Sequence, residues 1–214
     1  MRKIFLPSLT LFSLLISSCS TGTPQPTTPE VVSVYSSSAT EPWLSGLYDC
    51  AAAQNNTVLS RVNDPSIADI ALRLGEPEVL SVPAFQIDTE EILIVTHRQS
   101  PVQNLTLDEA RTLFTQGDPS VQVWVYASDE DVQQVFDQLV VEGRNVVSSA
   151  RVVVSPQQMS DALVNESNAV GILPRHWKVG DVRDVFSVAT VPVLVITRSE
   201  PQGVLKEIIA CLQK

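Results

Sequence analysis

Short stretches rich in β-branched and aromatic residues alternate along this chain with longer stretches in which apolar residues recur every three or four positions. The first pattern predicts strands, at residues 31–35, 57–61, 68–72, 90–97, 121–126, 151–154, 169–173 and 191–197. The second pattern predicts amphipathic helices, at residues 41–53, 104–114, 129–142, 157–165 and 204–212. This alternation indicates an α/β protein with mostly parallel strand pairing.

Polar residues stand where three of these helices begin. Thr106 is followed three positions later by Glu109, which is the spacing of a capping box. Ser155 and Thr40 occupy the capping position before the helices that follow them. Pro42 suits the first turn of the first helix, because its missing N–H has no partner there in any case.

The N-terminus has the pattern of a secretion signal. Arg2 and Lys3 precede an apolar run over residues 4–16, which is too short to span a bilayer. The run ends in Ile16-Ser17-Ser18-Cys19, which resembles a bacterial lipobox. That resemblance implies removal of residues 1–18, a lipid anchor on Cys19 and an extracytoplasmic location at the cell membrane. An ordinary signal peptide with an incidental cysteine is the alternative.

A tether and a negative charge follow from the composition. Residues 19–30 are rich in Thr and Pro and lack large apolar side chains, which predicts an extended linker between the lipid and the folded part. The formal net charge of the 214-residue chain is −10. An acidic chain repels phosphate backbones, so nucleic acid is excluded as a partner. An anionic ligand must therefore be held by local donors.

Two cysteines remain once Cys19 is assigned to the lipid. Cys50 and Cys211 form an even pair in an oxidising compartment, which favours a disulfide between the first helix and the last. Two buried free thiols are the alternative, because cysteine often serves as a small apolar residue.

The sequence contains no pattern for catalysis or metal binding. It has no Gly-x-Ser-x-Gly turn, phosphate loop or metalloprotease motif, so an enzyme is not expected. His97 and His176 are the only histidines, and neither has ligand-like spacing to another histidine or a cysteine. We therefore expect no metal and no cofactor. The basic and aromatic segment 175–178 could line the mouth of a cleft or face a partner, and a solvated loop is the default expectation.

The central segment 84–117 is similar to the crossover segment of phosphate-type periplasmic binding proteins, the solute receptors of ABC transporters. The matching features are an apolar strand, a proline-containing turn and a short helix, here Pro101, Asn104-Leu105-Thr106-Leu107, Arg111, Leu113-Phe114 and Gly117. Further matches lie in segments 34–40, 167–173 and 192–212. The resemblance covers residues 31 to 214 and implies a type 2 fold with two α/β lobes.

The family implies a ligand cleft between the lobes and a hinge of two crossing strands. We assign residues 31–90 and 186–214 to the first lobe and residues 91–185 to the second. Ligands in such folds meet the carboxyl ends of strands and the N-termini of helices. The candidate ligand-binding residues there are Ser36, Ser37, Ser38 and Thr40 of the first lobe, and Ser128 and Ser155 of the second. A serine-rich turn with a plain helix cap is the alternative for the first group.

The second lobe departs from the family pattern. Where phosphate receptors carry arginine and a Gly-Ser-Gly-Thr-like loop, this chain has Ala127-Ser128-Asp129-Glu130-Asp131. Carboxylates at a helix start already satisfy its dipole and leave less for an anion. Arg73 could donate to a ligand, although a salt-bridged or surface arginine is the simpler expectation.

Two functions follow from these observations. The first is a monomeric, lipid-anchored solute-binding protein that takes a small polar or anionic ligand and delivers it to an ABC permease. The alternative is a degenerate binding-protein-like lipoprotein, which acts as an interaction or structural module without a transported ligand.

Overall fold

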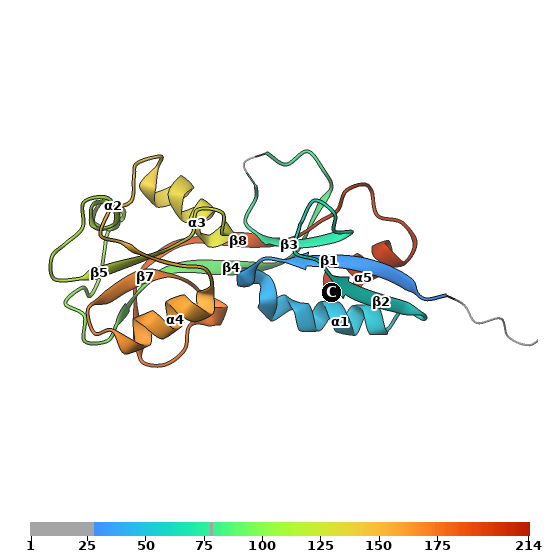
Figure 1. The fold of residues 1–214 in the computed structure, drawn as a ribbon, viewed down its shortest axis with the longest axis horizontal. Helices are drawn as coiled ribbons and strands as arrows, with labels where there is room; N and C mark the ends of the chain where they lie inside the picture. The colour runs from blue at the N-terminus through green and yellow to red at the C-terminus, as the bar shows by residue number, and fades with distance from the viewer. Residues whose placement is uncertain (1–27, 78) are drawn as a thin grey trace, which may run out of the picture.

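A computed structural model describes residues 28–77 and 79–214. Within them, eight strands form one mixed sheet in the order β2-β1-β3-β8-β4-β7-β5-β6. The molecule is elongated, with a group of elements at each end and two long strands that run between the groups (Figure 1). We call the two groups the first and the second lobe.

The first lobe is built on three parallel strands, β1 (Glu30–Ser36), β2 (Thr57–Arg61) and β3 (Ile70–Leu74). Their inward side chains pack with the helices α1 (Leu44–Ala52) and α5 (Gly203–Leu212) in one apolar core. Only eight residues connect β2 to β3, and they contain no helix. One face of this part of the sheet is therefore covered by helices and the other by loops.

The second lobe contains the parallel strands β5 (Gln122–Tyr126), β6 (Arg151–Val153) and β7 (Ala169–Pro174). The helices are α2 (Leu107–Gln116), α3 (Asp131–Phe136) and α4 (Pro156–Asn165). In Figure 1, α2 and α3 lie on one side of the sheet and α4 on the other. The larger apolar core lies between these layers, around Phe114, Phe136 and Met159.

The strands that connect the lobes are β4 (Ala84–His97) and β8 (Val182–Ile196), which pair antiparallel along their lengths. The sequence predicted only their apolar parts, 90–97 and 191–197. The remaining parts contain polar residues such as Asp88 and Asp184. In these parts polar and apolar residues alternate only weakly, so the sequence does not mark them as strands. The predicted lobe boundaries, after residues 90 and 185, fall inside these two strands. Because of the antiparallel pairings of β3, β4, β7 and β8, parallel pairing predominates only within each lobe.

The predicted disulfide is confirmed. Cys50 of α1 and Cys211 of α5 are bonded, with an S–S distance of 2.00 Å and a Cα–Cα distance of 5.8 Å. The bond joins the C-terminal turns of two helices that are 161 residues apart in sequence. It therefore closes a loop that includes the whole second lobe.

Two predicted helices are each divided into two helical segments, and the predicted helix 104–114 is observed as α2 at Leu107–Gln116. The predicted helix 41–53 is split into a 3₁₀ helix η1 (Ser38–Trp43) followed by α1, and Thr40 lies inside η1 instead of capping it. The Thr40 hydroxyl lies instead within donating distance of the carbonyl oxygens of Ser37 and Leu72. The predicted helix 129–142 is α3 followed by a π-helical turn η2 (Asp137–Val141).

The other two predicted caps are confirmed. Thr106 and Glu109 form both bonds of the capping box at the start of α2. The Ser155 hydroxyl accepts the N–H of Gln158 at the start of α4 at 3.3 Å.

The N-terminal predictions lie outside the described residues. This applies to the signal peptide 1–18, to the lipidation of Cys19 and to most of the tether 19–30. In residues 28–77 and 79–214, no helix combines the length and the apolar character needed to cross a membrane.

Candidate ligand site between the lobes

The candidate site lies where strands of the two lobes end opposite one another. In the first lobe, β1 ends at Ser36 and β3 ends at Leu74. In the second lobe, β5 ends at Tyr126 and a short turn leads into α3 at Asp131. The buried side chain of Gln133 fixes this turn, because its Oε1 accepts the N–H of Tyr126 at 2.9 Å.

Three of the four hydroxyls predicted to bind a ligand in the first lobe bond one another instead. Thr40 Oγ1 lies 3.0 Å from Ser36 Oγ and 3.2 Å from Ser37 Oγ. Thr40 Oγ1 also lies within donating distance of the carbonyl oxygens of Ser37 and Leu72, at 3.1 and 3.2 Å. Ser37 and Thr40 are buried, with exposed fractions of 4% and 0%. These hydroxyls brace the turn after β1.

The fourth hydroxyl reaches the other lobe. Ser38 Oγ donates to Glu130 Oε2 at 2.6 Å, across 92 residues of sequence. Glu130 is the residue directly before α3. A charge-assisted bond of this kind is stronger than one between neutral groups. The hydroxyl predicted to hold an anionic ligand therefore holds a carboxylate of the same chain.

A second carboxylate fills the rest of the site. Asp131 Oδ1 accepts the Nε of Arg73 at 2.6 Å and lies 2.5 Å from a second guanidinium nitrogen. Asp131 Oδ2 accepts the backbone N–H of Leu74 at 2.8 Å. The side chain of Asp131 is 2% exposed and that of Arg73 is 20% exposed. A guanidinium and a backbone N–H are the donors that an oxyanion prefers, and here Asp131 binds both.

The lobes approach closely at this point. Gly75 follows β3 with a φ of +75°, and a Cβ at this position would lie 2.7 Å from Cγ2 of Val135 in α3. The cavity beside Arg73, Gly75 and Asp131 has a volume of about 10 Å³. That is space for about one water molecule, whereas ligand pockets are usually about 300–1,000 Å³. In this conformation there is therefore no room for a solute directly beside Arg73 and Asp131.

The pKa shifts of the interlobe side chains are consistent with donors that are already paired with carboxylates of the chain. Burial raises the pKa of Glu130, and the bond from Ser38 opposes that rise only in part. Burial alone would lower the pKa of Arg73, but the charge and the hydrogen bond of Asp131, together with the nearby Tyr35 and Glu130, hold this pKa above its usual value. Burial also raises the pKa of Tyr126 well above its usual value, with a further contribution from Glu130. The fold therefore keeps the Arg73 cation paired with Asp131.

A second interlobe contact lies beside the long strands. After β7, the 3₁₀ turn η3 (Arg175–Trp177) brings His176 Nδ1 within 2.5 Å of Oε2 of the buried Glu90 in β4. The His176 ring packs on Trp43 of η1, with 4.8 Å between ring centroids. The indole N–H of Trp177 donates to the carbonyl of Ala39 at 3.2 Å. The segment expected to be a solvated loop thus joins the second lobe to the first.

The other two predicted site residues lie away from this contact. Ser128 is exposed in the turn between β5 and α3. Ser155 caps α4 after β6, the outermost strand of the sheet on the side of the second lobe. Their role as ligand contacts remains a prediction. Within the described ranges, no three His, Cys, Asp or Glu side chains are grouped so that they could hold a metal ion.

The sequence pointed to some of the interlobe residues and missed others. It marked Ser38, Arg73 and the acidic turn 129–131 separately, because hydroxyl, guanidinium and carboxylate groups near predicted strand ends are visible in a sequence. It could not pair Arg73 with Asp131, which lies 58 residues away. It missed the interlobe role of Glu90 because this residue begins the predicted strand 90–97 and resembles an ordinary charged residue at a strand end.

Comparison with known proteins gives fold relatives only. No protein-family model and no curated protein matches the chain. A putative phosphate ABC transporter substrate-binding protein from Clostridium perfringens, solved with bound phosphate, is 13% identical with a TM-score of 0.73, covering 86% of this chain and 93% of that one. An ABC-type phosphate transport receptor from Vibrio cholerae is 17% identical with a TM-score of 0.66 and the same coverage.

A third similar structure comes from a regulator. The regulatory domain of CcmR from Synechocystis, in complex with 2-PG, is 10% identical with a TM-score of 0.65, covering 86% of this chain and 96% of that one. The protein therefore has the type 2 periplasmic-binding-protein fold, as the sequence predicted. Because both transport receptors and regulatory domains share this fold, it does not by itself assign a function.

Proposed function

We propose that the protein is an extracytoplasmic lipoprotein with the fold of a solute receptor, whose interlobe site is filled by its own carboxylates. On this proposal it captures no phosphate-like anion and acts as an interaction module at the membrane surface. The lipobox-like residues 16–19 support the location, and the acidic turn before α3 supports the loss of anion binding.

One observation carries this proposal. The donors of the first lobe that face the second lobe, namely the Ser38 hydroxyl, the Arg73 guanidinium and the Leu74 N–H, all bond to Glu130 or Asp131. An anion that enters would have to displace the buried carboxylate of Asp131 from both the Arg73 guanidinium and the Leu74 N–H. It would also meet the negative charge of the other carboxylate in place of the donors that a receptor offers. Both effects oppose phosphate binding.

A second candidate function is the capture of a polar or cationic solute for an ABC permease. One structural relative was solved with bound phosphate, and hinge closure around a ligand is a common motion of two-lobed proteins. If the lobes separate, Glu130 and Asp131 become acceptors at the mouth of the cleft. A solute with an amino group would then be attracted where phosphate is repelled.

Thermal unfolding of the purified protein with a panel of anions, amines and sugars tests the proposal. A bound ligand at about 100 times its dissociation constant adds about 2.7 kcal/mol, which is a shift of several degrees in a protein of this size. We expect no shift with phosphate, sulfate or any other member of the panel. Reduction of the Cys50–Cys211 disulfide serves as the positive control, because it lowers the melting temperature in the same assay.

The outcomes separate the two functions. A shift with phosphate that disappears in Ser38→Ala would refute the filled site. A shift confined to amines, and lost in Glu130→Gln, would favour the solute receptor instead. Ser148→Ala is the matched control, because this serine is exposed in the second lobe and is not among the predicted ligand-binding residues.

A further inference from the structure

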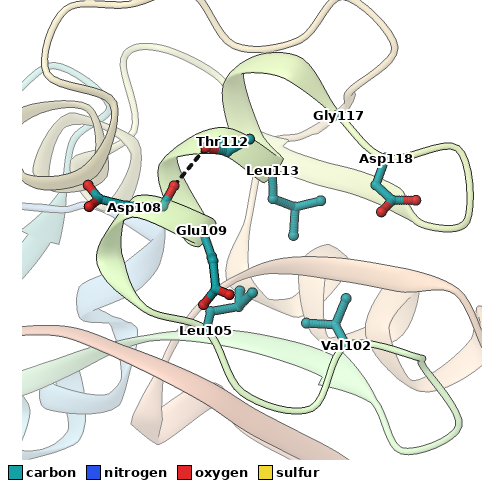
Figure 2. A pocket seen from close by; sticks show the side chains of 8 residues that line it. All are labelled: Val102, Leu105, Asp108, Glu109, Thr112, Leu113, Gly117 and Asp118. Carbon is teal, nitrogen blue, oxygen red and sulfur yellow. Dashed lines mark hydrogen bonds between the residues drawn. The ribbon is translucent and has the colours of Figure 1, made fainter.

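An open apolar groove runs along α2 in the second lobe, apart from the interlobe site. Its volume is about 370 Å³. The side chains of Val102, Leu105 and Leu113 converge to form its floor (Figure 2). Leu105 is held in place because its N–H donates to the carbonyl of Val185 in β8 at 2.9 Å. The floor is thus fixed to the sheet and to the helix.

Carboxylates stand at both ends of this floor. Glu109 lies above Leu105 near the start of α2, and Asp118 follows the helix at the other end (Figure 2). Gly117 ends α2 with a φ of +80°, a conformation that suits glycine, and so turns Asp118 out of the helix. The described lining contains no Lys, Arg or His.

Both carboxylates accept hydrogen bonds from neutral groups, which favour the charged form and do not compensate its charge. Glu109 accepts the backbone N–H and the hydroxyl of Thr106, each at 2.8 Å, and these bonds lower its pKa. Asp118 accepts the hydroxyl and the N–H of Ser120 at 2.6 and 2.7 Å, which lowers its pKa in the same way. Neither carboxylate forms a salt bridge among the described residues.

The one cationic side chain of α2, that of Arg111, forms its salt bridges away from the groove floor. Arg111 pairs with Asp108 at 2.8 Å and with Glu142 at 2.8 Å. In Figure 2 the carboxylate of Asp108 points away from the groove floor. The groove therefore presents two uncompensated negative charges over an apolar base.

We infer that this groove docks a partner-protein segment of the form basic-x-aliphatic-x-basic in an extended conformation. From Glu109 to Gly117 the helix rises by roughly 12 Å at about 1.5 Å per residue. In an extended segment, side chains four residues apart face the same way and lie roughly 13 Å apart. Two basic side chains at that spacing reach Glu109 and Asp118 while the aliphatic residue between them contacts the floor.

This inference does not depend on whether the interlobe site takes a solute. The groove is open along its length, which suits a chain segment better than an enclosed small molecule. An acidic rim around an apolar centre is also the arrangement that gives protein interfaces their orientation. A partner with this segment would bind at the end of the second lobe, away from the hinge.

Titration of the ¹⁵N-labelled protein with two peptides tests the inference. The first is acetyl-Gly-Lys-Ser-Leu-Ser-Lys-Gly-amide, and the second carries Glu in place of both Lys residues. We expect the lysine peptide to shift amide signals of residues 102–118 and the glutamate peptide to leave them unchanged. Spermidine provides the small-cation arm, and an equal response to spermidine would overturn docking of a protein segment.

The matched variants are Glu109→Gln with Asp118→Asn, which remove both charges and keep the acceptor oxygens of the cap and the turn. We expect these variants to weaken binding of the lysine peptide about fivefold at low salt, since two exposed charge pairs are lost and each contributes only modestly. Glu41→Gln with Asp49→Asn, two exposed positions in the first lobe, should leave the affinity unchanged. No binding of the lysine peptide, or equal binding to both double variants, would overturn the inference.

Discussion

Replacing Asp131 with alanine is expected to lower the free energy of unfolding by about 3–5 kcal/mol. The change leaves the Arg73 guanidinium without its carboxylate and the N–H of Leu74 without an acceptor, in a place where Asp131 itself is 2% exposed. A buried group that loses its partner pays its full desolvation cost. Urea denaturation of the purified variant measures the change.

Two further variants provide the comparison for Asp131→Ala. Asp129→Ala removes an exposed carboxylate from the same turn and should change the free energy of unfolding by less than about 0.5 kcal/mol. Asp131→Asn keeps an acceptor oxygen for Leu74 but loses the charge, so its effect should lie between the two. An equal effect of Asp129→Ala and Asp131→Ala would mean that the Arg73–Asp131 pair does not stabilise the closed lobes.

Removal of the Cys50–Cys211 disulfide is expected to cost about 4–5 kcal/mol. The bond closes a loop with a sequence separation of 161 residues, so the unfolded chain gains much conformational freedom when the bond is absent. The loss should appear as a lower urea midpoint for Cys50→Ala with Cys211→Ala than for the oxidised protein.

Reduction of the unmodified protein separates the bond from the packing of the two side chains. The reduced protein lacks the bond but keeps both sulfur atoms, and it should unfold close to the double variant. Addition of reductant to the double variant should change nothing. If oxidised and reduced protein unfold at the same urea concentration, the disulfide does not contribute to stability.

The elements that the sequence predicted best are those with a local cause. The apolar part of β4 and the cap of α2 at Thr106 and Glu109 depend on neighbouring residues only, and both are present. The outer parts of β4 and β8 were missed because their pairing with each other, not their own composition, makes them strands. The 3₁₀ turn η1 was missed because Thr40 bonds to Leu72, a residue 32 positions away.

The site was predictable in composition but not in arrangement. Ser38, Arg73 and the turn 129–131 could be marked from the sequence, and the missing glycines of that turn already argued against phosphate. The sequence could not show that the carboxylates of the second lobe bond to the donors of the first. Interlobe contacts such as Arg73 with Asp131 arise only when the whole sheet is assembled.

A spin-label distance between the lobes tests most directly whether the chain's own carboxylates hold the lobes together. Ser45→Cys in α1 and Gln116→Cys in α2 place labels on exposed positions of the two lobes, and the native Cys50 and Cys211 are bonded to each other. Without any ligand we predict one narrow distance distribution that phosphate leaves unchanged, and a broader, longer distribution in Asp131→Ala. A broad, long distribution in the unmodified protein that narrows when phosphate is added would contradict the account.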